Sequence, residues 1–587
     1  MARCSLWLLA AAPLVASCTG ALTSPSGAGP DLLQQSDHEV SFVCKPGALP
    51  TSSMQRLSRT QYENTVHDLL AAELPSQIDD VWREVASSFV GLPADTVSAA
   101  APFTSPFGTM DQAVSQQHVS AYFAVAQAVA QALTENDARV SALLGCHTGE
   151  ADADCVKRFI GAFARRAFRH EPLADELAFL SEVYAADGID VAGLRDVIAV
   201  LLNTPQFLYR VEFGAVAVAD KPGTYALSSA ELATRLAYHF WQSTPDDALL
   251  DRAKSGALDS DASYAQVVED VRHDARTLQG LRVFVNEWLG LDSLPPLDGQ
   301  LGTPVFDAFV GNDKPSATLR DDMVNDVLDS FVFHAGRADS LADWYESPYS
   351  FAKSDELAAI YGSEKWSGDD SEPPGFPAGQ RAGLLTRAAL LSTGTARTRP
   401  IMKGVLIRTR LLCDHVPPPP ANATNIPAAL TQTMSTRQVV EKLTEQPKSS
   451  CASCHAALIN PLGFATENYD ALGRIRTQEV LYSAEGKELA SMPVLTKSVP
   501  HVWSDDSQPS MGAADLTKMV IESGKAESCF ARQYIRFAYG RTDDDAVHGC
   551  ALESVRAALE DGHSLREAIG APVLRPEFRQ RFVGDVQ

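Results

Sequence analysis

The sequence lacks the features that define several common classes of protein. Basic residues are scarce, since 49 Lys and Arg stand against 74 Asp and Glu and give a formal net charge of −25. Nucleic-acid binding needs clustered Lys and Arg that neutralise phosphates, so we expect no nucleic-acid partner. The chain contains no G-x-S-x-G elbow, no G-x-x-x-x-G-K-[ST] phosphate loop and no H-E-x-x-H pair. Beyond the first 18 residues, no apolar run is long enough to span a bilayer.

One short motif carries recognisable chemistry. Cys451-Ala452-Ser453-Cys454-His455 has the form C-x-x-C-H, in which two cysteines reach the two vinyl-derived positions of one porphyrin edge. We therefore predict a single covalent haem c held by Cys451 and Cys454, with His455 as the proximal iron ligand. Met492, which precedes a proline, is the favoured candidate for the distal ligand, and Met511, Met519 and His501 are the alternatives. A near-infrared charge-transfer band would identify ligation by Met492.

Three other interpretations compete for the motif. Half of a zinc site would need a second Cys/His pair at finger-like spacing, which is absent. A redox-active dithiol usually opens a helix after a strand in a βαβ unit, and no such pattern surrounds the motif. A small structural disulfide loop between Cys451 and Cys454 stays open at the level of the sequence.

The first residues predict export. Arg3 is followed by an apolar run from Leu6 to Val15 and then by small residues ending at Cys18, which resembles a bacterial lipobox. We expect Cys18 to be lipidated and residues 19–45 to form a flexible tether. The protein would then be an exported periplasmic or cell-surface lipoprotein at the outer membrane, in contact with the membrane only through its lipid anchor. An ordinary cleaved signal peptide is the alternative.

The remaining cysteines indicate an oxidising compartment. Six cysteines lie outside the leader and the C-x-x-C-H motif, which permits three disulfides. Proximity in sequence favours Cys146 with Cys155 and Cys529 with Cys550. Cys44 and Cys413 would then close a long loop across the chain.

Helical periodicity dominates the rest, and strand signals are sparse. In Arg56–Leu70 the apolar residues fall mostly on one stripe, and Ser58 with Gln61 resembles a capping box. We predict a mainly α fold, a multi-helical body of successive modules with a small C-terminal cytochrome c-like haem region. The expected segments are 1–18 signal peptide, 19–45 tether, 46–145 N-terminal helical domain, 146–215 helical module, 216–362 central helical domain, 363–420 loop and helical module ending in a proline run, 421–505 haem-binding region and 506–587 C-terminal helical domain.

Several stretches together resemble one bacterial family. They are Arg56–Leu70, Leu202–Arg210, Asn286–Leu291, Arg381–Thr386 and Cys451–Arg476. The chain is similar to the large secreted cytochrome c-like proteins of planctomycetes and myxobacteria, which are built from successive domains of unknown function. The single C-x-x-C-H motif resembles the shorter myxobacterial type. Family members commonly carry aspartate at the position of Asn460, so this chain departs from the family pattern beside the motif.

The resemblance implies fold, export and haem more strongly than it implies a reaction. We expect a monohaem protein that transfers electrons, or the redox subunit of a periplasmic or cell-surface oxidoreductase, with a redox partner protein. The alternative is a surface binding or scaffold protein whose haem is structural. A third option, peroxidase-like catalysis, would require a five-coordinate iron. The sequence therefore leaves open whether the protein is an enzyme.

Overall fold

The structure is a computed structural model that describes residues 40–51, 54–98, 105–368, 371–417, 432–449 and 451–584. Within these residues the fold is mainly helical, which confirms the predicted fold class, and the sheets have only two or three strands each. Cys18 and the predicted leader lie outside the described residues. None of the helices that the structure describes is both long and apolar enough to cross a membrane.

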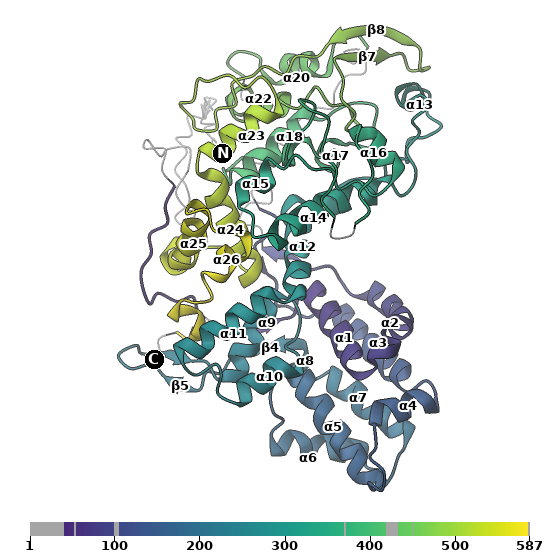
Figure 1. Cartoon of the computed structure of the whole chain (residues 1–587), viewed down its shortest axis with the longest axis vertical. Coiled ribbons are helices and arrows are strands. Elements are labelled where there is room, and N and C mark those ends of the chain that lie inside the picture. The colour runs from purple at the N-terminus through teal and green to yellow at the C-terminus, as the bar shows by residue number, and fades with distance from the viewer. Residues whose placement is uncertain are drawn as a thin grey trace, which may run out of the picture.

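The helices form two lobes, each with its own hydrophobic core. The first lobe, purple to blue at the lower right of Figure 1, has a core drawn from residues between Leu57 and Phe207, joined by Tyr238. Its elements are α1 (Arg59–Glu73), η2 (Pro75–Gln77), α2 (Ile78–Ala86), η3 (Ser87–Gly91), α3 (Gln116–Leu133), α4 (Asp137–Leu144), α5 (Asp152–Phe168), α6 (Ala174–Tyr184), α7 (Val191–Leu202) and α8 (Pro205–Leu208).

The second lobe contains the rest of the helices around one continuous core. Its first part, teal in Figure 1, consists of α9 (Ser229–Phe240), α10 (Asp247–Lys254), α11 (Asp261–His273), α12 (Ala275–Leu289), η4 (Leu291–Ser293), α13 (Pro304–Val310), α14 (Leu319–Gly336), α15 (Leu341–Tyr345) and α16 (Asp355–Tyr361). The green part holds η5 (Leu384–Thr386), α17 (Ala388–Leu391), α18 (Pro400–Leu406), the π-helix η6 (Ile407–Leu411), α20 (Thr436–Thr444), α21 (Ala452–Cys454), the π-helix η7 (His455–Ile459) and α22 (Asn460–Phe464). The chain ends with α23 (Ala513–Glu522), α24 (Lys525–Tyr539), α25 (Asp545–Glu560), α26 (Leu565–Gly570) and η8 (Pro576–Arg579).

The strands are short and every pairing between them is antiparallel. They are β1 (Gln55–Arg56) with β4 (Tyr209–Arg210), β2 (Val97–Ser98) with β3 (Thr109–Met110), β5 (Val216–Ala217) with β6 (Thr224–Ala226), β6 with β9 (Gln580–Phe582), and β7 (Gln478–Tyr482) with β8 (Glu488–Pro493). The pairing of β6 with β9 places the C-terminal segment beside residues 224–226.

Local sequence signals explain where helices begin. The capping box predicted at Ser58 and Gln61 is confirmed, because the Ser58 hydroxyl accepts from the Gln61 N–H at 3.1 Å and the Gln61 amide accepts from the Ser58 N–H at 3.2 Å. Ser228 and Glu231 form the same arrangement at the start of α9. These caps satisfy backbone donors that a helix leaves unpaired at its first turn.

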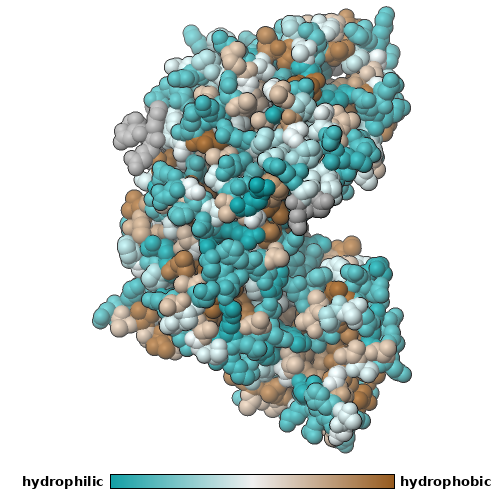
Figure 2. Space-filling view, viewed as in Figure 1, coloured by the Kyte–Doolittle hydropathy of each residue, from teal (hydrophilic) through white to brown (hydrophobic). Residues whose placement is uncertain are grey.

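Helix α9 joins the two lobes. The hydroxyl of Tyr238 lies 2.8 Å from the hydroxyl of Thr65 and accepts from the Arg169 guanidinium at 3.2 Å. Gln61 donates to the side chain of Gln242 at 2.9 Å. All five of these residues are buried, and Figure 2 shows that the surface is hollowed between the lobes on the side away from α25.

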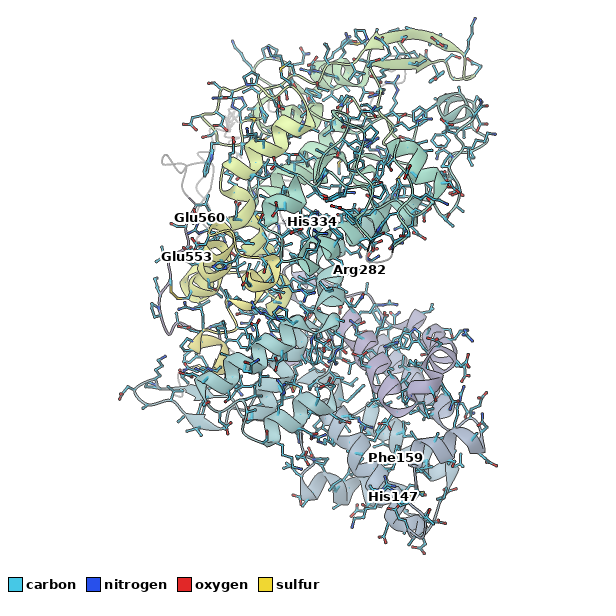
Figure 3. The ribbon with its side chains drawn as sticks, viewed as in Figure 1. His147, Phe159, Arg282, His334, Glu553 and Glu560 are labelled. Carbon is cyan, nitrogen blue, oxygen red and sulfur yellow. A yellow bond between two sulfur atoms is a disulfide. The ribbon has the colours of Figure 1, made fainter. Side chains whose placement is uncertain are left out.

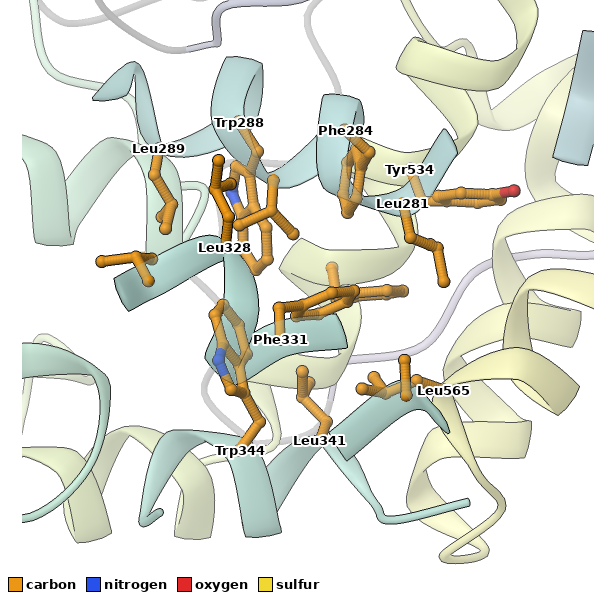
Figure 4. Close-up of a cluster of buried hydrophobic side chains, with 14 of the residues drawn as sticks. Leu281, Phe284, Trp288, Leu289, Leu328, Phe331, Leu341, Trp344, Tyr534 and Leu565 are labelled. Carbon is orange, nitrogen blue, oxygen red and sulfur yellow. The ribbon is translucent and has the colours of Figure 1, made fainter. Parts of the chain in front are cut away.

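The C-terminal helices share the core of the central helices. Figure 4 shows aromatic rings of α12, α14, α15 and α24 packed together. The Phe284 ring lies 5.3 Å from Tyr534 and 5.3 Å from Trp288, and Trp344 lies 4.7 Å from Phe331. Edge-to-face and offset contacts at these distances are favourable for aromatic rings. The segment that follows the C-x-x-C-H motif joins the same core through Leu462.

Three disulfides are present among the described residues, and one of the predicted pairings is correct. Cys146 pairs with Cys155 as expected. The predicted pairs Cys529–Cys550 and Cys44–Cys413 are wrong, because the structure pairs Cys44 with Cys550 and Cys413 with Cys529. Cys413 follows η6, which packs against α24, and so meets Cys529 there. Short sequence separation was therefore a poor guide to the partners of the two cysteines on α24 and α25.

The N-terminal segment lies along α25. The backbone N–H of Phe42 donates to the Glu553 carboxylate at 3.0 Å, and the Cys44–Cys550 disulfide follows directly. Figure 3 labels Glu553 and Glu560 on this outer helix. The first described part of the chain is thus held against one of the C-terminal helices.

Candidate functional site

The C-x-x-C-H motif lies in a continuous helical stretch. Cys451 precedes α21, Cys454 ends it, and His455 opens the π-helix η7. Residues three and four positions apart in a helix share a face, so the two thiols and the imidazole are on one side of this stretch. Both thiols are free and half-buried, so the disulfide loop left open by the sequence is not formed here.

Asn460 determines which ring nitrogen of His455 carries the hydrogen. The Asn460 amide nitrogen donates to the Thr444 hydroxyl at 2.9 Å and to the Glu445 carboxylate at 2.7 Å. A carboxylate is an acceptor, so the amide oxygen must face His455 Nδ1, which lies 3.1 Å away. Nδ1 therefore carries the hydrogen and Nε2 keeps its lone pair. A metal-bound histidine usually has this arrangement, in which the other ring nitrogen donates to an oxygen.

Two glycines bring the motif against α18. A Cβ on Gly404 would lie 2.0 Å from the Ile459 carbonyl oxygen, and one on Gly463 would lie 1.9 Å from the Pro400 carbonyl oxygen. Side chains larger than hydrogen are excluded at both positions. The backbones of α18 and of the η7–α22 stretch are therefore in direct contact, which sets the position of the helix that carries His455.

Arg408 ties the same stretch to the segment before α23. Its guanidinium is fully buried and donates to the Leu458 carbonyl at 2.9 Å, to the Pro500 carbonyl at 2.9 Å and to the His501 carbonyl at 3.0 Å. Burial lowers its pKa below the ordinary arginine value. One guanidinium thus holds carbonyl groups of two segments, η7 and the segment before α23.

Asp414 balances the charges in this buried region. Its carboxylate accepts from Arg408 at 2.9 Å and from Lys525 at 2.9 Å, and all three side chains have 0% exposure. The Lys525 ammonium also lies 4.5 Å from the centre of the Trp503 ring. Burial lowers the pKa of Lys525, and the carboxylate of Asp414 opposes that shift.

Glu467 forms a second buried ionic group behind the motif. Its carboxylate accepts from Thr398 at 2.7 Å, from Lys403 at 3.1 Å and from Arg476 at 3.2 Å. Burial lowers the pKa of Lys403. Since each group has a partner of opposite charge or a donor, this cluster is a structural support of the segment.

Two of the candidate distal ligands, Met492 and His501, lie in different surroundings. Met492 is half-buried on β8, where it faces Glu479 of β7. The backbone carbonyls of His501 and of Leu458 in η7 both accept hydrogen bonds from Arg408. The Nδ1 atom of the His501 ring is buried without a hydrogen-bond partner among the described residues. The structure therefore links His501 to the motif segment, and ligation by Met492 stays a prediction.

Within the described residues, one group of three possible metal ligands has its ligand atoms close together: Cys146, Glu150 and Cys155. Both sulfurs belong to a disulfide and are not thiolates. A buried structural metal site at that position is thus not supported. The C-x-x-C-H segment, with two free thiols and an imidazole Nε2 that keeps its lone pair, fits the attachment of haem c.

Four family models match the chain. Residues 55–135 match PSD3, a protein of unknown function (DUF1587), and residues 155–212 match PSD5 (DUF1595). Residues 227–363 match PSD4 (DUF1592), and residues 381–479, which include the C-x-x-C-H motif, match PSCyt3 (DUF1588). No curated protein and no solved structure matches the chain.

These matches define a multi-domain protein built from domains of unknown function. Such domains are found in cytochrome c-type proteins, so the predicted resemblance is confirmed at this level. The four matches follow one another along the chain and cover both lobes.

The sequence reveals the three motif residues but not those that position them. Asn460 stands out in the sequence only as a departure from a pattern, and Thr444, Glu445 and Arg408 carry no signal. Contacts between side chains separated by 15 or more positions, such as Glu445 with Asn460, are not visible in a single sequence.

Proposed function

We propose that the protein is an exported monohaem c-type cytochrome-like protein that transfers electrons, alone or as the redox subunit of a periplasmic or cell-surface oxidoreductase system. The observation that carries the proposal is the hydrogen bond between His455 Nδ1 and the fully buried Asn460, which leaves Nε2 available for iron beside two free thiols. Bound haem would supply one-electron chemistry whose potential depends on its ligands and their hydrogen bonds.

The residues of the chain have separate tasks in this proposal. Cys451 and Cys454 hold the porphyrin, and His455 Nε2 holds the iron. Asn460 orients the imidazole and keeps the proton on Nδ1. Arg408 fixes the carbonyl of Leu458 and so the helix behind the ring.

Export, a lipid anchor at Cys18 and a redox partner protein belong to the same proposal. The three disulfides support an oxidising compartment, because such bonds are rare where thiols are kept reduced. We propose contact with the membrane only through the lipid, and no nucleic-acid partner, in keeping with the net charge of −25.

The first prediction concerns attachment. Expressed in a host that matures c-type cytochromes, the protein should keep its haem through denaturing electrophoresis. Replacing both Cys451 and Cys454 with alanine should abolish the haem stain, because no thioether can form. The matched control replaces Cys146 and Cys155 with serine and should retain the stain. An unstained wild-type protein would contradict the proposal.

The second prediction concerns Asn460. Asn460→Leu removes the acceptor for His455 Nδ1–H, which makes the imidazole a weaker base and disfavours ferric iron. The midpoint potential should rise by roughly 60 mV, which corresponds to a tenfold change for one electron. Glu445→Gln keeps an acceptor oxygen for the Asn460 amide and should change the potential little. An equal shift in the two variants would argue against the assigned role of Asn460.

A further inference from the structure

A cavity of about 110 Å³ lies where the N-terminal segment meets α24, α25 and the C-terminal segment. Four arginines line it (Arg210, Arg235, Arg541 and Arg575), against two carboxylates (Glu212 and Glu577). The lining therefore has a formal excess of positive charge. None of these residues belongs to the C-x-x-C-H segment.

Both carboxylates are already engaged. Glu212 accepts from Arg235 at 2.7 Å, and Arg235 also donates to the backbone carbonyl of Gln580 at 3.1 Å. Glu577 accepts from the Gly47 N–H at 2.7 Å and lies 3.3 Å from Arg575. The charges of Arg210 and Arg541 thus have no carboxylate of their own among the ion pairs of the described residues.

Arg210 and Arg541 are held mainly by neutral oxygens. Arg210 donates to the Gln55 side chain at 2.6 Å, and its buried Nε has no hydrogen-bond partner among the described residues. Arg541 donates to the Thr51 carbonyl at 3.3 Å. Burial lowers the pKa of both guanidinium groups. Glu212, which is paired with Arg235, is the carboxylate that acts on both cations. Three guanidinium groups that share one carboxylate while partly removed from water are unfavourable, and a further anion in the cavity would relieve that cost.

His548 adds a neutral donor. Its Nδ1 accepts from the Asp544 N–H at 2.9 Å, so the hydrogen is on Nε2. The side chain is only 3% exposed, and Nε2 has no partner in the part of the chain that the structure describes. Burial lowers the pKa of His548, so the ring is neutral near pH 7.

His239 adds an acceptor. Its Nε2 donates to the Ile569 carbonyl at 3.0 Å, so the lone pair is on Nδ1. This ring is also 3% exposed, and Nδ1 is buried without a partner in the described structure. Burial lowers the pKa of His239 to about 4, which keeps the ring neutral. The lone pair of Nδ1 suits a hydroxyl donor and disfavours a second anionic oxygen.

We propose that this cavity binds a small hydroxylated carboxylate, with the carboxylate at Arg210, Arg541 and His548 and a hydroxyl donating to His239. Apolar groups of Leu49, Pro50 and Phe578 line the same cavity and would contact the carbon skeleton. A free hydroxy acid and a sugar acid share this chemistry. The site is separate from the proposed haem function, because its residues and its test do not involve the motif.

Calorimetric titration of the full-length protein tests the proposal with four probes: malate, succinate, glucuronate and inorganic phosphate. Malate or glucuronate should bind at least tenfold more tightly than succinate, which lacks the hydroxyl, and than phosphate. Tighter binding of malate would identify a free hydroxy acid, and tighter binding of glucuronate a sugar acid. The proposal would be overturned if neither malate nor glucuronate gave a heat of binding at about 10 mM, a concentration that detects weak sites. It would also be overturned if phosphate bound with the same affinity as they do.

Variants locate the binding. Arg541→Gln should weaken binding at least tenfold, whereas Arg83→Gln, which alters an arginine whose side chain is 73% exposed on α2, should leave it unchanged. His239→Phe should remove the preference for malate over succinate. Circular dichroism shows whether each variant is folded. If the variant at the buried His239 fails to fold, the affinity of Arg541→Gln still tests whether the ligand binds in this cavity. Unchanged affinity in a folded Arg541→Gln protein would overturn the assignment.

Discussion

Replacing Asp414 with asparagine should lower the free energy of unfolding by about 3–5 kcal/mol. The substitution keeps the shape of the side chain and removes the only charge that balances the buried Arg408 and Lys525 within their hydrogen-bonded group. Two cations would then stay in a region with 0% exposure. The cost follows from desolvated charge that has lost its partner.

Chemical denaturation followed by circular dichroism measures this loss. Asp80→Asn is the matched control, because its ion pair with Arg83 is largely exposed and such pairs contribute about 0–1 kcal/mol. A loss at Asp414 no larger than that at Asp80 would show that water reaches the buried group.

The defect should also depend on pH. Burial lowers the pKa of Lys525 in the folded protein, and losing Asp414 removes the larger of the two carboxylate interactions that oppose this shift, leaving only that of Asp506. The unfolded chain then binds more protons than the folded chain, so stability rises with pH. The difference between the variant and the wild type should therefore shrink as the pH is raised toward the ordinary lysine pKa of 10.5.

Removing the Cys44–Cys550 disulfide by a double substitution to serine should cost about 2–5 kcal/mol. This bond closes a loop across 506 positions, and the entropy gained by the unfolded chain on release grows with loop length. The N-terminal segment should also become more open to proteases, since it would then be held only by non-covalent contacts, such as the burial of the Phe42 side chain and the hydrogen bond from Gly47 to Glu577.

The control is the Cys146–Cys155 disulfide, which closes only 9 positions and should contribute clearly less. Thermal unfolding and limited proteolysis of the two double variants make the comparison. Equal losses of stability in the two double variants would mean that the Cys44–Cys550 bond contributes mainly through packing in the folded state and not through loop closure.

Local chemistry made part of the fold predictable. Ser58 and Gln61 act within one turn of helix, so the capping box could be identified from spacing alone. The C-x-x-C-H spacing likewise groups Cys451, Cys454 and His455 on one short segment, because all three fall within five consecutive positions. Cys146 and Cys155 were paired correctly because they are 9 positions apart and lie in the same lobe.

Contacts between residues far apart in the sequence could not be predicted. Cys529 lies on α24 beside Cys413, 116 positions away, and nothing in the sequence distinguishes that partner from the nearer Cys550. Asn460 holds His455 only because Glu445 and Thr444 orient its amide. The arginine-lined cavity was equally hidden, since Arg210 and Arg541 approach each other only after the chain has folded.

The bond between Cys44 and Cys550 also fixes an order of events in folding. The first lobe can collapse as soon as its residues are available, because domains generally fold as units. Cys44 must wait for a cysteine that is synthesised 506 positions later. Formation of this bond therefore marks the completion of the fold, and a protein with a free Cys44 thiol would be one whose assembly is unfinished.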